Sequence, residues 1–489
     1  MTKKQISMVT LSLLLANIMS GLDATIINTA IPAIVSDLHG IQYMGWIVAC
    51  FLLGISVSVP IWSKIGERMS NKFAFELSLA LFILGSVLEG VAPDIYFFFF
   101  FRVLMGVGAG GMGSLPYVIV GYIYPNIKRR TVILSYIAAS FSAACIAGPL
   151  VGGWIVDALS WHWVFYINVP LGLVSIILSF IFYRGIRKPN VNTVFDRLGA
   201  FTLIGGLTCF LIGIQMLGLA SNLLVALFII IGITMLVWFI LVEKKAESPI
   251  VPLSVFTNKA LVGDFILFAF AWGAYIAVNT YLPMWSQAIL GTSALIGGMT
   301  LIPNSIFDIA GSQSTPHLLR RFNNYHLLIF DLSLIAITVI GLIVVPISTP
   351  YQVLMSIAAL SGLGVGSIFV ILQIKVQIDA GEKDMAPATS LSFLIRILAQ
   401  TVMAAVYGVI MNLALARGIA GHHNITMTMM NKLSDVESAK SLPRALMPTM
   451  RTIFHTGIRE IMIVSLLLII CGYIVNFVYN HHEAKKAAE

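Results

Sequence analysis

The sequence predicts an all-α polytopic membrane protein with fourteen transmembrane helices. Apolar residues make up 58% of the 489-residue chain, charged residues only 10%, and the mean hydropathy is +0.95. These values lie far from the usual balance of a soluble domain. A spanning helix needs about 20 mostly apolar residues. The stretches that meet this requirement are 8–29, 44–63, 73–92, 97–121, 131–156, 163–184, 198–218, 223–243, 261–285, 294–314, 326–346, 350–373, 386–413 and 457–479.

Lysine and arginine residues in the short connections between these stretches indicate the orientation of the chain. Lys and Arg residues occur in every second connection, and the short connections between these carry none. The long loop 414–456 is the one basic connection on the side opposite the clusters. Cytoplasmic connections are enriched in Lys and Arg, so both termini are predicted to be cytoplasmic. The basic clusters are Lys3 and Lys4, Lys64 to Lys72, Lys128 to Arg130, Arg184 to Arg197, Lys244 to Lys259, Arg320 and Arg321, Lys375 and Lys383, and Lys485 and Lys486.

Several function classes are excluded by composition and motifs. The net charge of +8 is scattered in short clusters and forms no basic face for nucleic acid. The four cysteines lie in apolar segments, the paired histidines lie in a loop and a tail, and neither set has the spacing of a metal site. There is no phosphate loop for ATP. We therefore expect no metal, no cofactor, no nucleic-acid partner and no enzyme activity.

An internal repeat divides the chain into two halves. The run from Gly106 to Gly110 in the fourth apolar segment is echoed by the run from Gly362 to Gly366 in the twelfth. Segments seven and eight then stand as an insertion between two six-helix repeats, which is consistent with parallel repeats around a midplane site. The predicted domains are 1–188, a six-helix bundle; 189–259, an interfacial segment with the two inserted helices; and 260–489, a six-helix bundle with the long external loop 414–456.

Two ionisable residues inside apolar segments are candidates for transport chemistry. Asp23 lies in LDATIINTAIP, residues 22–32, and Arg102 begins RVLMGVGAG, residues 102–110. Counting from the ends of their segments places both at similar depth. The two stretches resemble the first-helix and fourth-helix motifs of the fourteen-helix drug:proton antiporters, the QacA/EmrB type of the major facilitator superfamily. That resemblance implies a role for both residues in proton coupling; a structural hydrogen bond of the Asp and a plain salt bridge are the alternatives.

The fifth apolar segment contains Gly148, Pro149, Gly152 and Gly153, preceded by a run of Ala and Ser. Small residues let helix backbones approach closely, and a membrane helix tolerates proline when neighbours cover the kink. We therefore predict close approach between the halves at this helix. The G-P-x-x-G-G spacing resembles the antiporter motif of the same superfamily, which marks exporters; the alternative is that Gly and Pro are simply commoner in membrane helices.

The loop after segment two carries Glu67, Arg68 and Lys72. These residues match in charge the superfamily's loop motif G-x-L-a-D-R-x-G-R-K, whereas Ser63, Ser70 and Asn71 depart from it. The match predicts a cytoplasmic latch that holds the two halves together through charge pairing and a helix end.

Polar and aromatic residues in the second half are candidates for a substrate cavity. Aromatic side chains suit lipophilic cations, and buried ionisable groups are expected to face a cavity or a partner helix; lipid contact or helix packing is the alternative for each. Asp264, Asp331 and Glu76 lie nearer cytoplasmic helix ends, where capping or interfacial solvation is expected. The candidate cavity residues are Trp272, Tyr275, Asn279, Asp308, Arg396 and Gln400.

The resemblance covers essentially the whole chain and implies the major facilitator fold and a proton-coupled multidrug exporter that works by alternating access. The expected partners are lipophilic, often cationic small molecules, protons and the lipid bilayer, with the protein acting as a monomer in a bacterial plasma membrane. Two alternatives stay open: an exporter of one specific lipid, antibiotic or metabolite on the same fold, and a non-transporting membrane sensor or scaffold.

Overall fold

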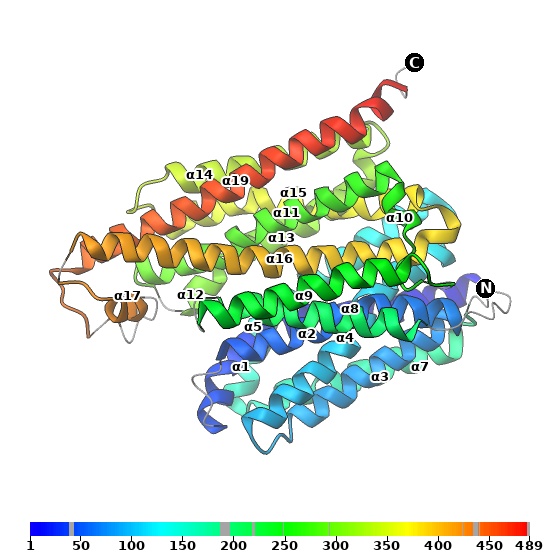
Figure 1. Cartoon of the computed structure of the whole chain (residues 1–489), viewed down its shortest axis with the longest axis horizontal. Helices are drawn as coiled ribbons and strands as arrows, with labels where there is room; N and C mark the ends of the chain where they lie inside the picture. The colour runs from blue at the N-terminus through cyan, green and yellow to red at the C-terminus, as the bar shows by residue number, and fades with distance from the viewer. Residues whose placement is uncertain are drawn as a thin grey trace. The chain divides into compact units, whose positions relative to one another are not determined.

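A computed structural model describes residues 1–38, 44–185, 196–217, 221–247, 249–292, 294–422, 424–433, 439 and 441–486. Every regular element among them is helical, as predicted (Figure 1). The elements are α1 (Lys3–Asp37), α2 (Met44–Arg68), α3 (Asn71–Glu89), α4 (Ile95–Ile123), α5 (Ile127–Ala158), α6 (His162–Tyr166), α7 (Asn168–Phe182), α8 (Arg197–Gln215), α9 (Asn222–Glu243), α10 (Ser254–Thr257), α11 (Lys259–Met284), the π-helix η2 (Trp285–Ile289), α12 (Ala294–Met299), α13 (Ile302–Leu318), α14 (Asn324–Val344), α15 (Tyr351–Asp379), α16 (Gly381–Ala420), α17 (Met427–Leu433) and α19 (Met447–Lys486).

Within the described residues, 13 helices are long and apolar enough to cross a membrane. The predicted tenth segment, 294–314, is divided between α12 and α13. Pro303 lies in the first turn of α13, where proline favours the start of a helix because no backbone donor is needed there. This break explains why one of the fourteen predicted spans is not a single long helix. The architecture is that of a multi-pass α-helical membrane protein.

The chain forms two compact units. The first contains residues 1–264 together with 372–397, and the second contains 265–371 and 398–489. Within the first unit, Gln377 of α15 donates a hydrogen bond to the carbonyl of Tyr117 in α4 (2.9 Å). The predicted boundary at 188 lies outside the described residues, and the division into 1–188, 189–259 and 260–489 stays a prediction.

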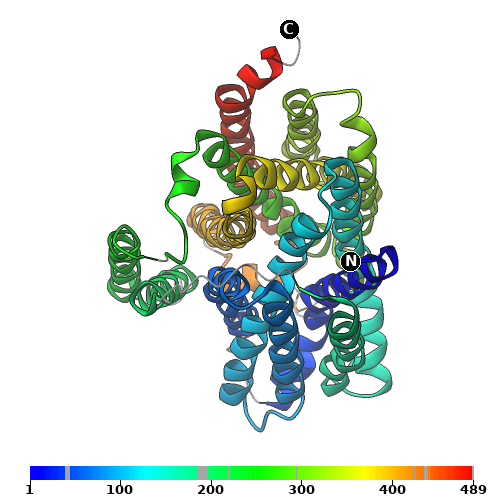
Figure 2. The same ribbon diagram turned by 90° about the vertical axis from the view of Figure 1, so that its right-hand side faces the viewer.

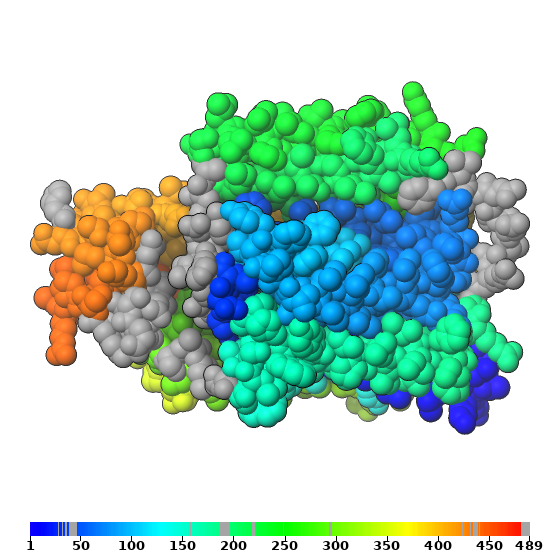
Figure 3. All heavy atoms as spheres, turned by 90° about the horizontal axis from the view of Figure 1, so that it is seen from below, coloured from blue at the N-terminus to red at the C-terminus, as the bar shows by residue number. Residues whose placement is uncertain are grey.

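The two inserted helices, α8 and α9, pack against each other as a pair that lies along α2 in the first unit (Figures 1 and 2). In the space-filling view the pair forms a layer beside the blue helices of this unit (Figure 3). Lys64 of α2 donates a hydrogen bond to the carbonyl of Pro249 (2.7 Å), which follows α9. The outer side of α9 exposes large apolar residues, with Leu223 83% and Ile230 61% accessible, as expected of a helix in contact with lipid.

The glycine repeat in α4 lets two neighbouring helices approach its backbone closely. A Cβ atom at Gly108 would lie 2.7 Å from the Cα of Phe82 in α3, and one at Gly106 would lie 3.1 Å from the Cα of Gly54 in α2. Gly110 also faces α2, where a Cβ would lie 2.9 Å from a backbone carbonyl. These are backbone contacts that only glycine permits, and they fix α4 between α2 and α3.

The echo of this repeat in α15 has the same alternation. Gly362 and Gly366 face α13, and Gly364 faces α14, where a Cβ would lie 2.6 Å from the carbonyl oxygen of Asp331. The middle glycine therefore packs on the preceding helix in both halves: α3, which comes before α4, and α14, which comes before α15. The sequence repeat corresponds to a repeated packing arrangement inside each unit.

Candidate functional site

Asp23 and Arg102 meet inside the first unit. Asp23 lies in the interior of α1, and Arg102 lies two turns into α4, whose first turn is capped by the Asp94 carboxylate. Both are about 1% exposed. Arg102 Nη1 lies 3.5 Å from Asp23 Oδ1. The sequence-based expectation of similar depth agrees with this contact, in which two residues far apart in sequence form a buried ion pair.

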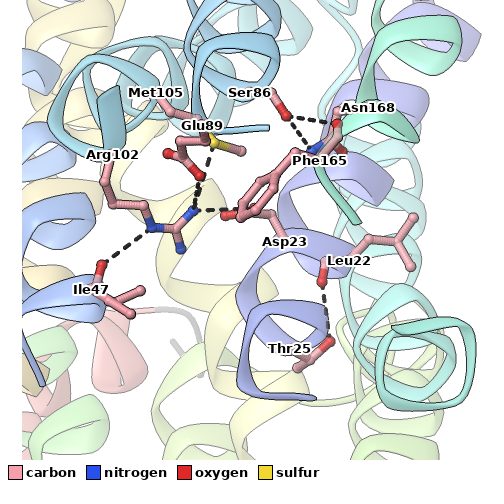
Figure 4. A network of polar contacts seen from close by, with 10 residues as sticks. All are labelled: Leu22, Asp23, Thr25, Ile47, Ser86, Glu89, Arg102, Met105, Phe165 and Asn168. Atoms are coloured by element: carbon pink, nitrogen blue, oxygen red, sulfur yellow. Dashed lines mark hydrogen bonds and ion pairs between the residues drawn. The ribbon is translucent and has the colours of Figure 1, made fainter. Parts of the chain in front are cut away.

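A third charged residue, Glu89, completes the cluster and was missed by the sequence analysis. Glu89 is the last residue of α3, is fully buried, and places Oε2 3.4 Å from the same Arg102 Nη1 (Figure 4). Its signal was available: Glu89 lies within the predicted span 73–92, three residues from the external end. The depth count that paired Asp23 with Arg102, applied to Glu89, would have placed it at a similar depth.

The short helix α6 packs against the end of α3, where Glu89 is fully buried. The Tyr166 hydroxyl donates to the carbonyl of Gly90 (2.8 Å), and the Ser86 hydroxyl donates to the carbonyl of Phe165 (2.8 Å). Asn168 in turn donates to the Ser86 hydroxyl (3.0 Å), as Figure 4 shows. These bonds satisfy polar groups at a helix end that would otherwise need solvent.

An apolar cluster lies on the predicted external side of the three charges. Phe98 of α4 packs edge-on against Trp161 and Phe165, with ring centroids 6.2 and 5.8 Å away. Ile26 of α1 and Ile47 of α2 belong to the same buried cluster. The cluster separates the charges from the external end of the helices and gives them a low-dielectric environment, in which electrostatic interactions are strong.

The Arg102 guanidinium is held on several sides. Its Nε donates to the carbonyl of Ile47 (3.2 Å), and its Cζ lies 4.2 Å from the centroid of the Phe51 ring. The two carboxylates each contact it through one oxygen, while Asp23 Oδ2 and Glu89 Oε1 are buried without a hydrogen-bond partner. One fixed cation therefore faces two acids, an arrangement that can bind and release a proton.

The glycines of the fifth-segment motif pack against α1 beside Asp23. A Cβ at Gly148 would overlap the Thr25 hydroxyl, and a Cβ at Gly152 would lie 2.6 Å from Ile26 Cγ1. The prediction that these glycines serve close approach between the halves is corrected here: the close approach joins α5 to α1 within one unit. Nothing lies within 4 Å of a Cβ at Gly153, and Pro149 continues the helix without ending it.

The predicted latch residues make local contacts in the first unit. Glu67 Oε2 lies 3.8 Å from Lys64 Nζ, one turn earlier in α2. Lys72 donates to the carbonyl of Phe180 in α7 (2.7 Å), and Arg68 is exposed. These contacts tie α2 and α3 to their own neighbours; a latch between the halves stays a prediction.

The candidate cavity residues are distributed over both units. Trp272, Tyr275, Asn279, Asp308 and Gln400 belong to the second unit, and Arg396 belongs to the first. In the second unit, the Tyr275 hydroxyl donates to the side chain of Asn304 in α13, and the Trp272 ring packs on Phe369 (6.0 Å). Asn279, Gln400 and Asp308 are half-buried, and Asp308 lies next to Gly366 of α15. Arg396 is buried, and its Cζ lies 5.1 Å from the centroid of the Phe393 ring. Their role in a cavity stays a prediction.

Three acids expected at solvated helix ends have different environments. Asp264 is fully buried, 3.9 Å from Lys375 Nζ, and Asp331 is buried and accepts a hydrogen bond from the Ser367 hydroxyl (2.6 Å). Glu76 is half-buried and accepts a hydrogen bond from Ser179 of α7 (2.9 Å). Neighbouring helices cover these positions, so the expectation of capping or interfacial solvation was wrong for Asp264 and Asp331.

Buried charges inside a bundle of membrane-spanning helices are typical of membrane transport proteins, because ionisable groups at membrane depth mark pathways for ions or substrates. The sequence profile of the Major Facilitator Superfamily matches residues 13–404. The chain belongs to the major facilitator superfamily.

Relatives and solved structures agree with this family. The chain is 30% identical to "Multidrug transporter protein MdtP" of Bacillus subtilis, over 82% of this chain and 74% of that protein. It is 30% identical to "Multidrug resistance protein 3" of the same organism, over 84% and 80%. The structure of the human organic anion transporter MFSD10 is similar in fold, with a TM-score of 0.61, 12% identity and coverage of 95% and 99%. The relatives are transporters, and this chain is an efflux-type transporter of the same superfamily.

Proposed function

We propose that this protein is a proton-coupled multidrug exporter of the plasma membrane, which moves lipophilic, often cationic compounds outward by alternating access. The observation that carries the proposal is the buried contact between Asp23 and Arg102, 3.5 Å apart and about 1% exposed. The names of the two Bacillus subtilis relatives, a multidrug transporter protein and a multidrug resistance protein, support the substrate class.

A buried carboxylate beside a fixed cation supports proton coupling in the following way. When Asp23 is ionised, the pair is held by charge; when Asp23 binds a proton from water on one side, the ion pair weakens. Gly148 of α5 contacts Thr25, which lies about half a turn after Asp23 in α1. Asp23 and the α1–α5 contact therefore lie in the same turn of α1, so a rearrangement of the helices at this contact would also move the carboxylate.

The aromatic residues of α11 support a lipophilic substrate. Trp272 and Tyr275 offer ring faces, which attract cations, and Asn279 offers a polar group on the same helix. We infer that transport needs no cofactor and no ATP, since the proton gradient supplies the driving force. We also infer that one chain is sufficient for transport.

Ethidium transport in proteoliposomes tests the proposal. The purified full-length protein is reconstituted, a pH difference is imposed, and ethidium movement is recorded by fluorescence. We expect uphill ethidium transport with counterflow of protons, abolished by Asp23→Asn and by collapse of the gradient. Asp37→Asn is the matched control, because Asp37 lies at the exposed end of the same helix.

Three outcomes would contradict the proposal. Uphill transport by Asp23→Asn with normal proton counterflow would place the proton site elsewhere. Transport of one compound only, from a panel of lipophilic cations and neutral drugs, would favour a dedicated exporter. Absence of any substrate-driven proton flux across the panel would favour a sensor or scaffold.

A further inference from the structure

The geometry around Arg102 contains more negative charge than one guanidinium can balance. Asp23 and Glu89 approach the same nitrogen, Nη1, at 3.5 and 3.4 Å, and both side chains are at most 2% exposed. The second carboxylate is not a distant neighbour: it comes from α3, whereas the first comes from α1, so two helices bring acids to one face of the cation (Figure 4).

Each carboxylate also has one oxygen that is buried and has no hydrogen-bond partner, Oδ2 of Asp23 and Oε1 of Glu89. With both acids ionised, the cluster would carry a net negative charge in an apolar environment, which is strongly unfavourable. Two carboxylates that share a buried site therefore hold a proton between them. With one proton bound, the cluster has one carboxylate, one carboxylic acid and one guanidinium, and its net charge is zero.

Among the described residues, the ion pairs of Arg102 are with these two acids. Of the helices packed against the site, α7 has no ionisable side chain, and the charged residues of α2 lie at its opposite end. The cations of α5, Lys128 to Arg130, also lie at its opposite end, and Asp157 is the one charged residue of α5 at the external end. Cys50 of α2, Cys145 of α5 and Tyr166 of α6 also lie near the site; the Cys145 thiol contacts the carbonyl of Gly21, and the Tyr166 hydroxyl donates to the carbonyl of Gly90. His162 stacks on Trp161 of the apolar cluster. Arg102 is the cation that both acids contact, so the excess charge belongs to the two carboxylates.

We propose that Glu89 and Asp23 form one shared proton-binding site opposite Arg102, in which Glu89 is the second carboxyl of the transport cycle. This inference rests on the proposed proton coupling. It adds Glu89 to the proton-binding site and assigns one proton to the two carboxylates. One proton enters from external water, binds the doubly ionised pair and makes the cluster neutral. The same proton leaves to water on the cytoplasmic side, and the pair returns to two carboxylates.

This site predicts a result that a purely structural Glu89 would not give. Glu89→Gln leaves Asp23 and Arg102 as a balanced ion pair that needs no proton, just as Asp23→Asn leaves Glu89 and Arg102 balanced. Either change alone should therefore remove the exchangeable proton, although the other acid remains. A Glu89 that only positions Arg102 would tolerate Gln, which keeps an oxygen acceptor of the same length.

The test compares wild type, Glu89→Gln and Glu89→Asp in the ethidium proteoliposome assay, with Glu76→Gln as the matched control from the same helix. Glu76 is half-buried and bonded to Ser179, away from Arg102. We expect Glu89→Gln to lose pH-driven uphill transport and proton counterflow while still exchanging ethidium down its own gradient. Glu89→Asp should restore coupling with a displaced pH profile, and Glu76→Gln should transport like wild type.

A second measurement uses only the wild-type protein and covers the case in which Glu89→Gln does not fold. Dicyclohexylcarbodiimide adds to protonated carboxyl groups in apolar surroundings, and mass spectrometry locates the adduct. We expect modification at Glu89 or Asp23, decreasing at alkaline pH and in the presence of ethidium. The peptide containing Glu76 serves as the internal reference.

The outcomes separate this inference from the proposed function. If wild type shows no proton-driven transport, the proposed function fails. If wild type is coupled and Glu89→Gln moves the same number of protons for each ethidium, the shared site is overturned and the function stands. Carbodiimide modification at neither Glu89 nor Asp23 in an active wild-type protein would also overturn the shared site.

Discussion

Replacing Gly148 by alanine tests how tightly α5 is packed on α1 beside the charged cluster. The added Cβ would overlap the Thr25 hydroxyl oxygen and lie 3.1 Å from Thr25 Cβ and 3.3 Å from the backbone nitrogen of Ile26. The Thr25 hydroxyl lies 3.2 Å from the carbonyl oxygen of Gly21, to which it donates. The side chain must therefore rotate away from that acceptor, or α1 must move away from α5.

The magnitude follows from these contacts. Overpacking by one carbon in a tight interface costs about 1–3 kcal/mol, and losing one neutral hydrogen bond costs about 1 kcal/mol. If the overpacking strain alone falls on only one of two transport conformations, their equilibrium shifts by roughly 5- to 150-fold, and loss of the hydrogen bond increases the shift. Because Thr25 is two residues from Asp23, the displacement reaches the proposed proton site.

Gly153→Ala is the matched control, since nothing lies within 4 Å of a Cβ at that position. Both substitutions gain the same intrinsic helix propensity, about 1 kcal/mol, so their difference isolates the contact with α1. We expect Gly148→Ala to lower the melting temperature in detergent and to slow ethidium efflux, and Gly153→Ala to do neither. Adding Thr25→Ala should restore Gly148→Ala. Equal stability and equal efflux of the two glycine variants would refute this packing argument.

Three further predictions concern topology and packing. In a protein without its native cysteines, a cysteine that replaces Lys128 should be labelled only after permeabilisation. A cysteine that replaces Val91, which is 59% exposed, should be labelled in intact cells. The reverse pattern would overturn the orientation with both termini in the cytoplasm. Lys375→Met removes the cation 3.9 Å from buried Asp264 and should cost about 3–5 kcal/mol, measured as loss of monodisperse protein in size-exclusion chromatography. Gly108→Ala places a carbon 2.7 Å from the α3 backbone and should lower the melting temperature, whereas an unchanged value would contradict the close contact of α3 and α4.

The helices and the Asp23–Arg102 pair were predictable for a physical reason. A membrane helix satisfies its own backbone hydrogen bonds, so a long apolar stretch is sufficient to identify it. The bilayer also gives every residue a depth, and depth can be counted from helix ends. That count placed Asp23 near Arg102, although it could not supply the distance of 3.5 Å.

Lateral contacts were not predictable, because depth says nothing about which helix lies beside which. Gly148 was recognised as a close-contact residue, but the sequence did not reveal that its partner is Thr25 on α1. Asp331 was expected in solvent because it lies near a helix end, yet the Ser367 hydroxyl from a neighbouring helix binds it. Whether a helix end is solvated depends on what covers it.

The sequence by itself determined the class of the protein, the succession of its helices and two members of the charged cluster. Only the tertiary structure decided that Glu89 is the third. Glu89 is buried against Arg102 of α4, at an end of α3 to which α6 is bonded through Phe165 and Tyr166. Burial of a helix end is a property of contacts between segments distant along the chain; the place of Glu89 in the predicted span 73–92 gives its depth but not those contacts.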